Sequence, residues 1–266
     1  MISILRYFLF ICKKDKIFLS LALLILGCFS TSLFFGWTMI DEIKQAQAVY
    51  FAGSVRFVLI FCFVVFICFF ISKFFLNKEL EFLCSLPQNR TTFLLSLFTC
   101  FTVIALICTG FVGALFIYFH FTSPIFSLHG LLIWLATLFA ELLIVSIFAI
   151  FLSLSYQNPA VSIIVSVLFY LVARSIGFIT SALYTSASAS STILFLPQNK
   201  ILAGVSSFSA KFLGVFFPRL DLLANSSWII YGNFDPKTLA TILLQIIVYT
   251  ALIFALSLFD FKKKEF

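Results

Sequence analysis

Long apolar runs separated by short polar segments make up most of the chain. Six of these runs reach about 20 residues, the length that crosses a bilayer core as a helix. None shows the strict alternation of a membrane β-strand, so the pattern predicts an all-α integral membrane bundle. We expect the six transmembrane helices at about 17–38, 54–75, 92–118, 131–155, 160–183 and 238–259.

Composition agrees with this pattern. Of the 266 residues, 63% are hydrophobic and only 10% are charged, whereas soluble domains have about 25% charged residues. This excludes a soluble globular protein and a disordered chain. The net charge of +7 does not indicate a nucleic-acid partner, because basic residues in a membrane protein mark its cytoplasmic side. We therefore expect one transmembrane domain over residues 1–266, in contact with membrane lipid.

The basic residues also predict the orientation. Lys and Arg gather in the N-terminal segment, in the connection between the second and third spans, and at the C-terminus, but they are sparse or balanced elsewhere. Both termini are then cytoplasmic, in agreement with an even number of spans. A seventh span at 201–217 would place the Lys-rich tail outside, so we expect an interfacial or re-entrant helix there. Residues 1–14 predict a short amphipathic helix in the inner interface; the alternative is an irregular cytoplasmic lead-in.

Several kinds of chemistry have no signature in the sequence. It contains no phosphate-binding loop of the GxxxxGK[ST] type, no GxSxG elbow and no HExxH pair. The seven cysteines show no CxxC or Cys/His ligand spacing, so we expect them to pack as small apolar residues. We expect no enzyme, no metal site and no cofactor within this chain, which leaves transport, assembly or scaffolding.

The segment 77–90, NKELEFLCSLPQNR, is the most informative connection. Glu79 and Glu81 suit the first turn of a helix, where the helix dipole favours negative charge. Leu83 contributes to an apolar edge at helical spacing, and Pro87 ends the helix. The pattern predicts a short amphipathic helix along the inner membrane face, joined stiffly to two long spans. A partner that pushed it would move both spans together.

The run Leu80–Arg90, LEFLCSLPQNR, resembles the "LExLLSLPxxR" signature of ABC-2 type permeases, and lies after the second span as it does in that family. The resemblance implies that this segment is a coupling helix, which docks into a separate cytoplasmic ATP-binding cassette subunit that carries ATP and Mg. The residues implied in this contact are Glu79, Glu81, Leu83, Pro87 and Arg90. The alternative is a solvated loop of an unrelated six-span protein.

What the resemblance implies for the whole chain is a permease subunit in the bacterial cytoplasmic (inner) membrane. Such a subunit works with a second permease chain, as a homo- or heterodimer, and exports a substrate by alternating access. Two other functions stay open on the residues alone. One is a stand-alone secondary transporter or channel with an ion-coupled site at Glu141, and the other is a non-transporting scaffold.

Two ionisable residues lie deep in predicted spans, Glu141 in the fourth and Arg174 in the fifth. At 1.5 Å per residue each is roughly 21 Å from the turn that joins these spans, so we expect them at one depth and paired. The pair either fixes the two helices or forms a polar site on a substrate pathway. Arg56 and Lys73, near opposite ends of the second span, are expected to snorkel to their interfaces.

The longest predicted non-spanning region is the outer segment 184–237. It opens with a Ser/Ala-rich tract, Thr185 to Thr192, which we expect to be flexible. The segment resembles the outer helical gate that ABC-2 permeases have before the last span, which implies that it closes the exit of a pathway. The alternative is a membrane-skimming lid without a gating role.

Overall fold

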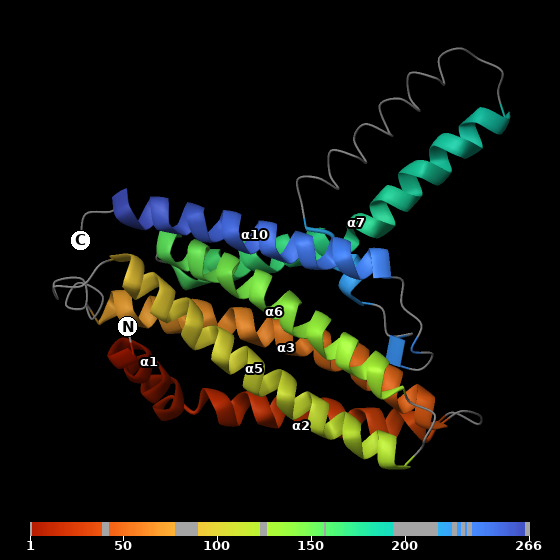
Figure 1. Cartoon of the computed structure of the whole chain (residues 1–266), viewed down its shortest axis with the longest axis horizontal. Helices are drawn as coiled ribbons and strands as arrows, with labels where there is room; N and C mark the ends of the chain where they lie inside the picture. The colour runs from red at the N-terminus through yellow and green to blue at the C-terminus, as the bar shows by residue number, and fades with distance from the viewer. Residues whose placement is uncertain are drawn as a thin grey trace.

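The computed structural model describes residues 2–38, 43–77, 90–122, 127–156, 158–193, 218–224, 228–229, 232 and 236–263. All regular structure in these ranges is helical (Figure 1). The elements are α1 (Ile2–Lys14), α2 (Ile17–Gly36), α3 (Ile43–Leu76), α5 (Arg90–Thr122), α6 (Leu128–Tyr156), α7 (Pro159–Ile193), the 3₁₀ helix η1 (Leu220–Ala224) and α10 (Pro236–Lys263).

Six of these helices, α2, α3, α5, α6, α7 and α10, are long and apolar enough to cross a membrane. The prediction of an all-α chain with six membrane-crossing helices is therefore confirmed for the described residues. The expected short N-terminal helix is present as α1. The sidedness of the two termini stays a prediction.

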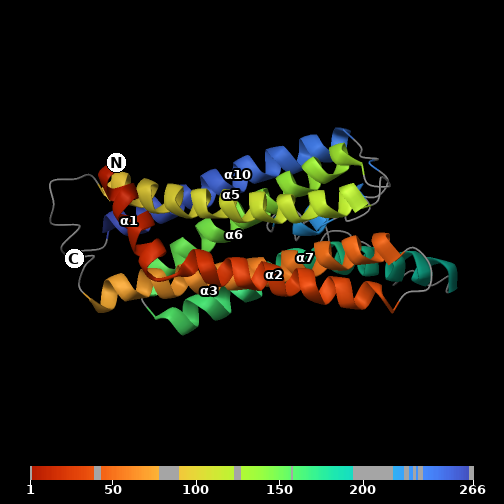
Figure 2. The same ribbon diagram turned by 90° about the horizontal axis from the view of Figure 1, so that it is seen from below.

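The central element of the bundle is α6. It packs against α3, α5, α7, α10 and η1, and Figures 1 and 2 show it between the other long helices. Its buried positions alternate large side chains such as Trp134 and Leu138 with small ones such as Ala149 and Ser153. Small residues let neighbouring helix backbones approach closely, which is the usual basis of helix packing in membranes. A polar residue on α6 is consequently enclosed from several sides.

A tight turn joins α6 to α7 and makes these helices antiparallel neighbours. The Asn158 side-chain oxygen accepts a hydrogen bond from the backbone N–H of Ala160 at 3.0 Å, and Pro159 occupies the first position of α7. Asn before a helix and Pro at its first position are both favoured, because each suits backbone groups that have no partner inside the helix. This turn sets the relative depth of side chains on α6 and α7.

Two helices extend further than their apolar runs. The Ser/Ala tract Thr185 to Thr192 lies within α7, which continues through it to Ile193, about ten residues beyond the predicted end of this span. No glycine or proline interrupts the chain between Gly177 and Pro197, and alanine is the best helix former. The second predicted span corresponds to α3. This helix begins at Ile43, well before the predicted start at residue 54.

An aromatic cluster ties together one end of the bundle, where α1, the end of α3, the start of α5 and the end of α10 meet (Figures 1 and 2). Phe8 of α1 is fully buried, with ring-centroid distances of 6.2 Å to Phe70, 5.6 Å to Phe74 and 5.7 Å to Phe93. Phe93 stacks in turn on Phe261 at 5.6 Å. We call these five residues the Phe8 cluster. It joins both helices that flank the connection 78–89.

Candidate functional site

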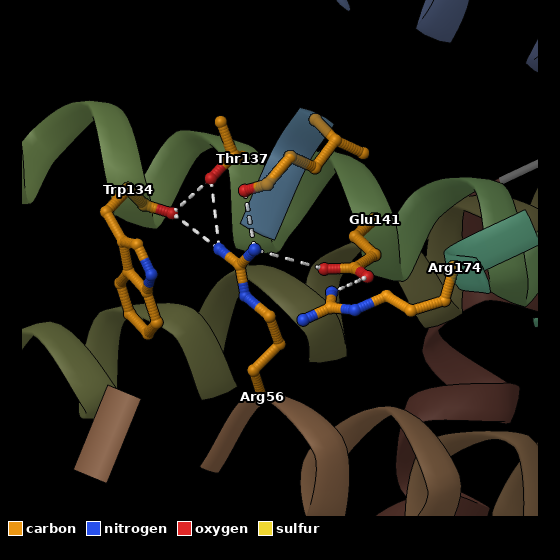
Figure 3. Close-up of polar contacts among 6 residues, drawn as sticks. Arg56, Trp134, Thr137, Glu141 and Arg174 are labelled. Carbon is orange, nitrogen blue, oxygen red and sulfur yellow. Dashed lines mark hydrogen bonds and ion pairs between the residues drawn. The ribbon is translucent and has the colours of Figure 1, made fainter. Parts of the chain in front are cut away.

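Three charged side chains meet inside the apolar bundle, one each from α3, α6 and α7 (Figure 3). Glu141 is fully buried on α6, and its Oε1 accepts a hydrogen bond from Arg174 Nη1 at 3.0 Å. Its Oε2 lies 3.5 Å from Arg56 Nη1. We call these residues the charge cluster. The two residues that residue counting places at one depth are thus in contact, and a third charge joins them.

Arg56 is the unexpected member of the charge cluster. The expectation that it snorkels to an interface is wrong, because only 2% of its side chain is exposed. Its guanidinium donates hydrogen bonds to the Leu223 carbonyl oxygen at 2.5 Å and to Thr137 Oγ1 at 3.1 Å, and lies 3.5 Å from the Trp134 carbonyl oxygen. It also lies 4.9 Å from the centre of the Trp134 ring, a cation–π geometry. Its burial is therefore compensated by several acceptors.

The hydroxyl of Thr137 completes this arrangement. It donates a hydrogen bond to the Trp134 carbonyl oxygen at 2.8 Å and accepts one from Arg56. The hydroxyl thus acts both as a donor and as an acceptor. Leu223 lies in the last turn of η1, where carbonyl groups have no partner inside the helix. A cation is favoured at such a helix end. Arg56 consequently caps η1 and fixes it to the middle of α3 and α6.

A second contact holds η1 against α7. Asp221 of η1 pairs with Arg219 at 3.0 Å and faces Gly177 of α7 so closely that a β-carbon at Gly177 would collide with the carboxylate. Glycine is the residue that permits this approach, because it has no side chain. The 3₁₀ helix η1 is thus attached to the bundle at two places, through the Leu223 carbonyl and through the close contact of Asp221 with α7.

Among the described residues, the charge cluster has a net charge of +1, because two guanidiniums surround one carboxylate. Tyr170 of α7 adds a phenol beside Glu141. Among the described residues, Glu141 Oε2 has no hydrogen-bond partner, and neither does Arg56 Nε. Chemically, this arrangement can brace three helices, bind an anionic group, or do both.

The residues of the ABC-2-like segment are only in part described. The residues Glu79, Glu81, Leu83 and Pro87 lie outside the described residues. Arg90 is the first residue of α5, and its Nη1 donates to the Phe261 carbonyl oxygen at 3.2 Å. Within the described part of the chain, Arg90 therefore joins the start of α5 to the end of α10, beside the Phe8 cluster.

Cysteines and one apolar groove are the remaining features of the described bundle. Six cysteines are described and all are free thiols, and the described ranges hold no group of three His, Cys, Asp or Glu side chains that could bind a metal. An open apolar groove of about 300 Å³ lies between α5, α6 and α10, lined by Leu95, Phe98, Ile147, Ile247, Thr250, Ala251 and Phe254. We call it the α5–α10 groove.

Comparison of the chain with protein-family models, with curated proteins and with solved structures finds no match.

Proposed function

We propose that the chain is the permease subunit of an ATP-binding cassette transporter of the ABC-2 type. A separate cytoplasmic ATPase subunit binds ATP and Mg, and closure of the ATPase pushes segment 80–90. The permease then alternates between inward and outward access and exports a substrate. Two permease chains form the pathway, both termini of each chain are cytoplasmic, and the complex lies in the bacterial inner membrane.

The observation that carries this proposal is the packing around the ends of the signature segment. The segment leaves α3 and enters α5, and the Phe8 cluster holds the ends of both helices against α1 and α10. Arg90, the last residue of the signature, adds its hydrogen bond to α10. A push on the segment therefore acts on four helices that are packed as a unit, which is the mechanical property that a coupling segment requires.

The charge cluster supplies a second line of support. Arg56 lies on the same helix as the start of the segment, α3, and it holds η1 of the outer region through the Leu223 carbonyl. Movement of α3 thus displaces Arg56, the residue that holds η1 in the middle of the bundle. This arrangement suits an exit gate that responds to an event at the ATPase.

Deletion of Leu80–Pro87 tests the mechanism. We expect the shortened chain still to insert in the membrane, because all six apolar helices are retained. It should no longer copurify with the ATPase subunit, and substrate should no longer stimulate ATP hydrolysis by that subunit. The matched control is Asp15→Asn, which changes an exposed ion pair at the same end of the bundle. Undiminished coupling in the deletion variant refutes the proposed role of the segment.

Flux measurements in vesicles reconstituted with the chain, with and without the ATPase subunit, separate the other functions. Substrate flux through the chain alone, driven by an ion gradient without ATP, favours a secondary transporter or channel. Absence of flux, combined with stable binding to a protein other than an ATPase, favours a scaffold. ATP-dependent flux that requires the ATPase subunit favours the permease.

A further inference from the structure

Helix α1 has two different faces, and the bundle covers only one of them. Ile4, Phe8 and Cys12, at a spacing of four residues, are buried against the bundle. An isolated amphipathic helix turns its apolar face to the lipid, but here the protein core takes up that face. The opposite face is exposed and mixes cationic with aromatic side chains at helical spacing, and we call it the α1 outer face: Arg6, Tyr7, Phe10, Lys13 and Lys14.

The contacts of α1 place this face at the end of the apolar bundle. Phe8 contacts Phe70 and Phe74 in the last two turns of α3. It also contacts Phe93 in the first turn of α5. Only two residues separate α1 from α2, and the second of them, Lys16, has a φ of 56°, so the chain turns there and Figure 1 shows α1 inclined to α2. Helix α1 therefore lies where three membrane-crossing helices leave the hydrocarbon, at the depth of lipid headgroups.

The charges at this end of the chain are mostly of one sign. Asp15 is the only acidic residue among the first forty, and both of its carboxylate oxygens accept hydrogen bonds from Lys73 of α3, at 2.9 and 2.8 Å. Four other side chains of this segment are exposed cations that form no ion pair with an acid of the described residues: Arg6, Lys13, Lys14 and Lys16. The segment thus presents an excess of positive charge beside the start of a membrane-crossing helix.

We propose that the α1 outer face binds anionic phospholipid headgroups of the adjacent leaflet, with the phosphates on the cations and the aromatic rings among the headgroups. Anionic lipid attracts basic segments next to a membrane-crossing helix. Tyr7 and Phe10, which are 41% and 66% exposed, suit this partner, because interfacial helices place aromatic rings at that depth. The inference concerns the chain alone and holds with or without an ATPase partner.

Lipid bound to α1 also acts on the bundle. Phe8 lies on the opposite side of α1 and joins it to the ends of α3 and α5, the two helices that flank the connection 78–89. A ligand that binds only the folded arrangement stabilises it by mass action. Anionic lipid should therefore raise the melting temperature of the chain. As a statement about regulation of the coupling segment, this consequence rests on the proposed function.

The test uses the purified full chain, without the ATPase, in a nonionic detergent. Phosphatidylglycerol is added in steps, and the bound lipids are counted by native mass spectrometry. Phosphatidylcholine with the same acyl chains is the zwitterionic comparison. We expect phosphatidylglycerol to bind more tightly and to raise the melting temperature more than phosphatidylcholine does. Both differences should shrink as the salt concentration rises, because salt screens exposed charges.

Three variants locate the site. The triple substitution Arg6→Gln, Lys13→Gln and Lys14→Gln should weaken phosphatidylglycerol binding by about 10- to 100-fold, since each cation near an anionic surface contributes a factor of about five. The charge-preserving triple substitution Arg6→Lys, Lys13→Arg and Lys14→Arg should retain the affinity. Lys44→Gln removes a cation from the other end of α3 and is the matched control, which should also bind as the wild type does. None of these changes removes a side chain of the buried core, and elution volume without added lipid checks that each variant folds.

Four results overturn the inference. The first is unchanged phosphatidylglycerol affinity in the folded charge-neutralised triple variant, and the second is equal affinity for the two lipids. The third is an equal loss in Lys44→Gln, which means that net charge rather than the α1 outer face sets the affinity. The fourth is loss of copurification with the ATPase in the neutralised variant without any change in lipid binding, which means that a protein covers this face. Failure of the proposed function looks different: ATP hydrolysis is then uncoupled from the chain, while lipid binding and its dependence on the α1 cations persist.

Discussion

The three members of the charge cluster should respond unequally to neutralisation. Glu141→Gln leaves two guanidiniums, one of them buried, without a counter-charge and raises the net charge of the cluster from +1 to +2. Arg56→Gln or Arg174→Gln instead lowers the net charge to zero, because the remaining arginine still pairs with Glu141. We therefore expect Glu141→Gln to be the most destabilising of the three substitutions.

The magnitudes follow from what each change leaves unpaired. Removal of one partner from a buried ion pair costs about 3–5 kcal/mol, which applies to Glu141→Gln. Arg56→Gln leaves the Leu223 carbonyl oxygen without its donor, a loss of about 1–3 kcal/mol. Arg174→Gln should cost about 1 kcal/mol, because the side chain is one-third exposed and water or headgroups replace part of its pairing.

The assay is equilibrium unfolding in mixed detergent micelles with increasing SDS, followed by circular dichroism and tryptophan fluorescence. Ser175→Ala is the matched control, since within the described residues its exposed hydroxyl donates to the Val172 carbonyl of its own helix. The expected order of the unfolding free energy is control, Arg174→Gln, Arg56→Gln, Glu141→Gln, from highest to lowest. Equal losses for all three, or a larger loss for Arg174→Gln than for Glu141→Gln, refute this account of the cluster.

A charge swap sharpens the same test. Exchange of the two partners, Glu141→Arg with Arg174→Glu, is the usual proof of an ion pair. Here it places a second guanidinium beside buried Arg56, so the double variant should remain unstable although the pair exists. Adding Arg56→Gln removes this repulsion, and the triple variant should recover part of the lost stability. No recovery in the triple variant contradicts the pairing of positions 141 and 174.

Three further changes probe other parts of the bundle. Phe8→Ala should lower the unfolding free energy by about 3–5 kcal/mol, because it empties the centre of the Phe8 cluster. Phe10→Ala, on the exposed side of α1, is the control and should have almost no effect in the same SDS titration. Gly130→Val should destabilise the chain and lower its yield in membranes, because the new side chain collides with the Trp228 carbonyl oxygen; wild-type yield and melting temperature contradict this contact. Asp15→Asn should change stability by less than about 0.5 kcal/mol, because its ion pair is exposed, and a larger loss in thermal melting shows that the pair is not a surface one.

The sequence predicts the features that depend on length and on local chemistry. Six apolar runs give six helices, and the Asn158–Pro159 turn makes α6 and α7 antiparallel neighbours. Counting residues from that turn then places Glu141 and Arg174 at one depth. These inferences need no knowledge of how the helices are rotated about their axes.

What the sequence does not predict depends on that rotation and on distant segments. Arg56 lies two residues inside the predicted span start, which suggests an interfacial position, but α3 begins at Ile43 and carries Arg56 deeper. Its acceptor is the backbone carbonyl of Leu223, a group that every residue has and that leaves no signature in a sequence. A charged residue inside an apolar helix is the one available signal for such a site.

The continuity of α3 has a mechanical consequence. From Arg56 to Leu76 the helix spans twenty residues, about 30 Å, and contains neither glycine nor proline. Such a stretch has no hinge, so a tilt imposed at Leu76 reaches the guanidinium of Arg56 as a rigid-body displacement. The hydrogen bond to the Leu223 carbonyl then either moves η1 or breaks. A single spectroscopic label on η1 therefore reports a tilt of α3 that is imposed at Leu76.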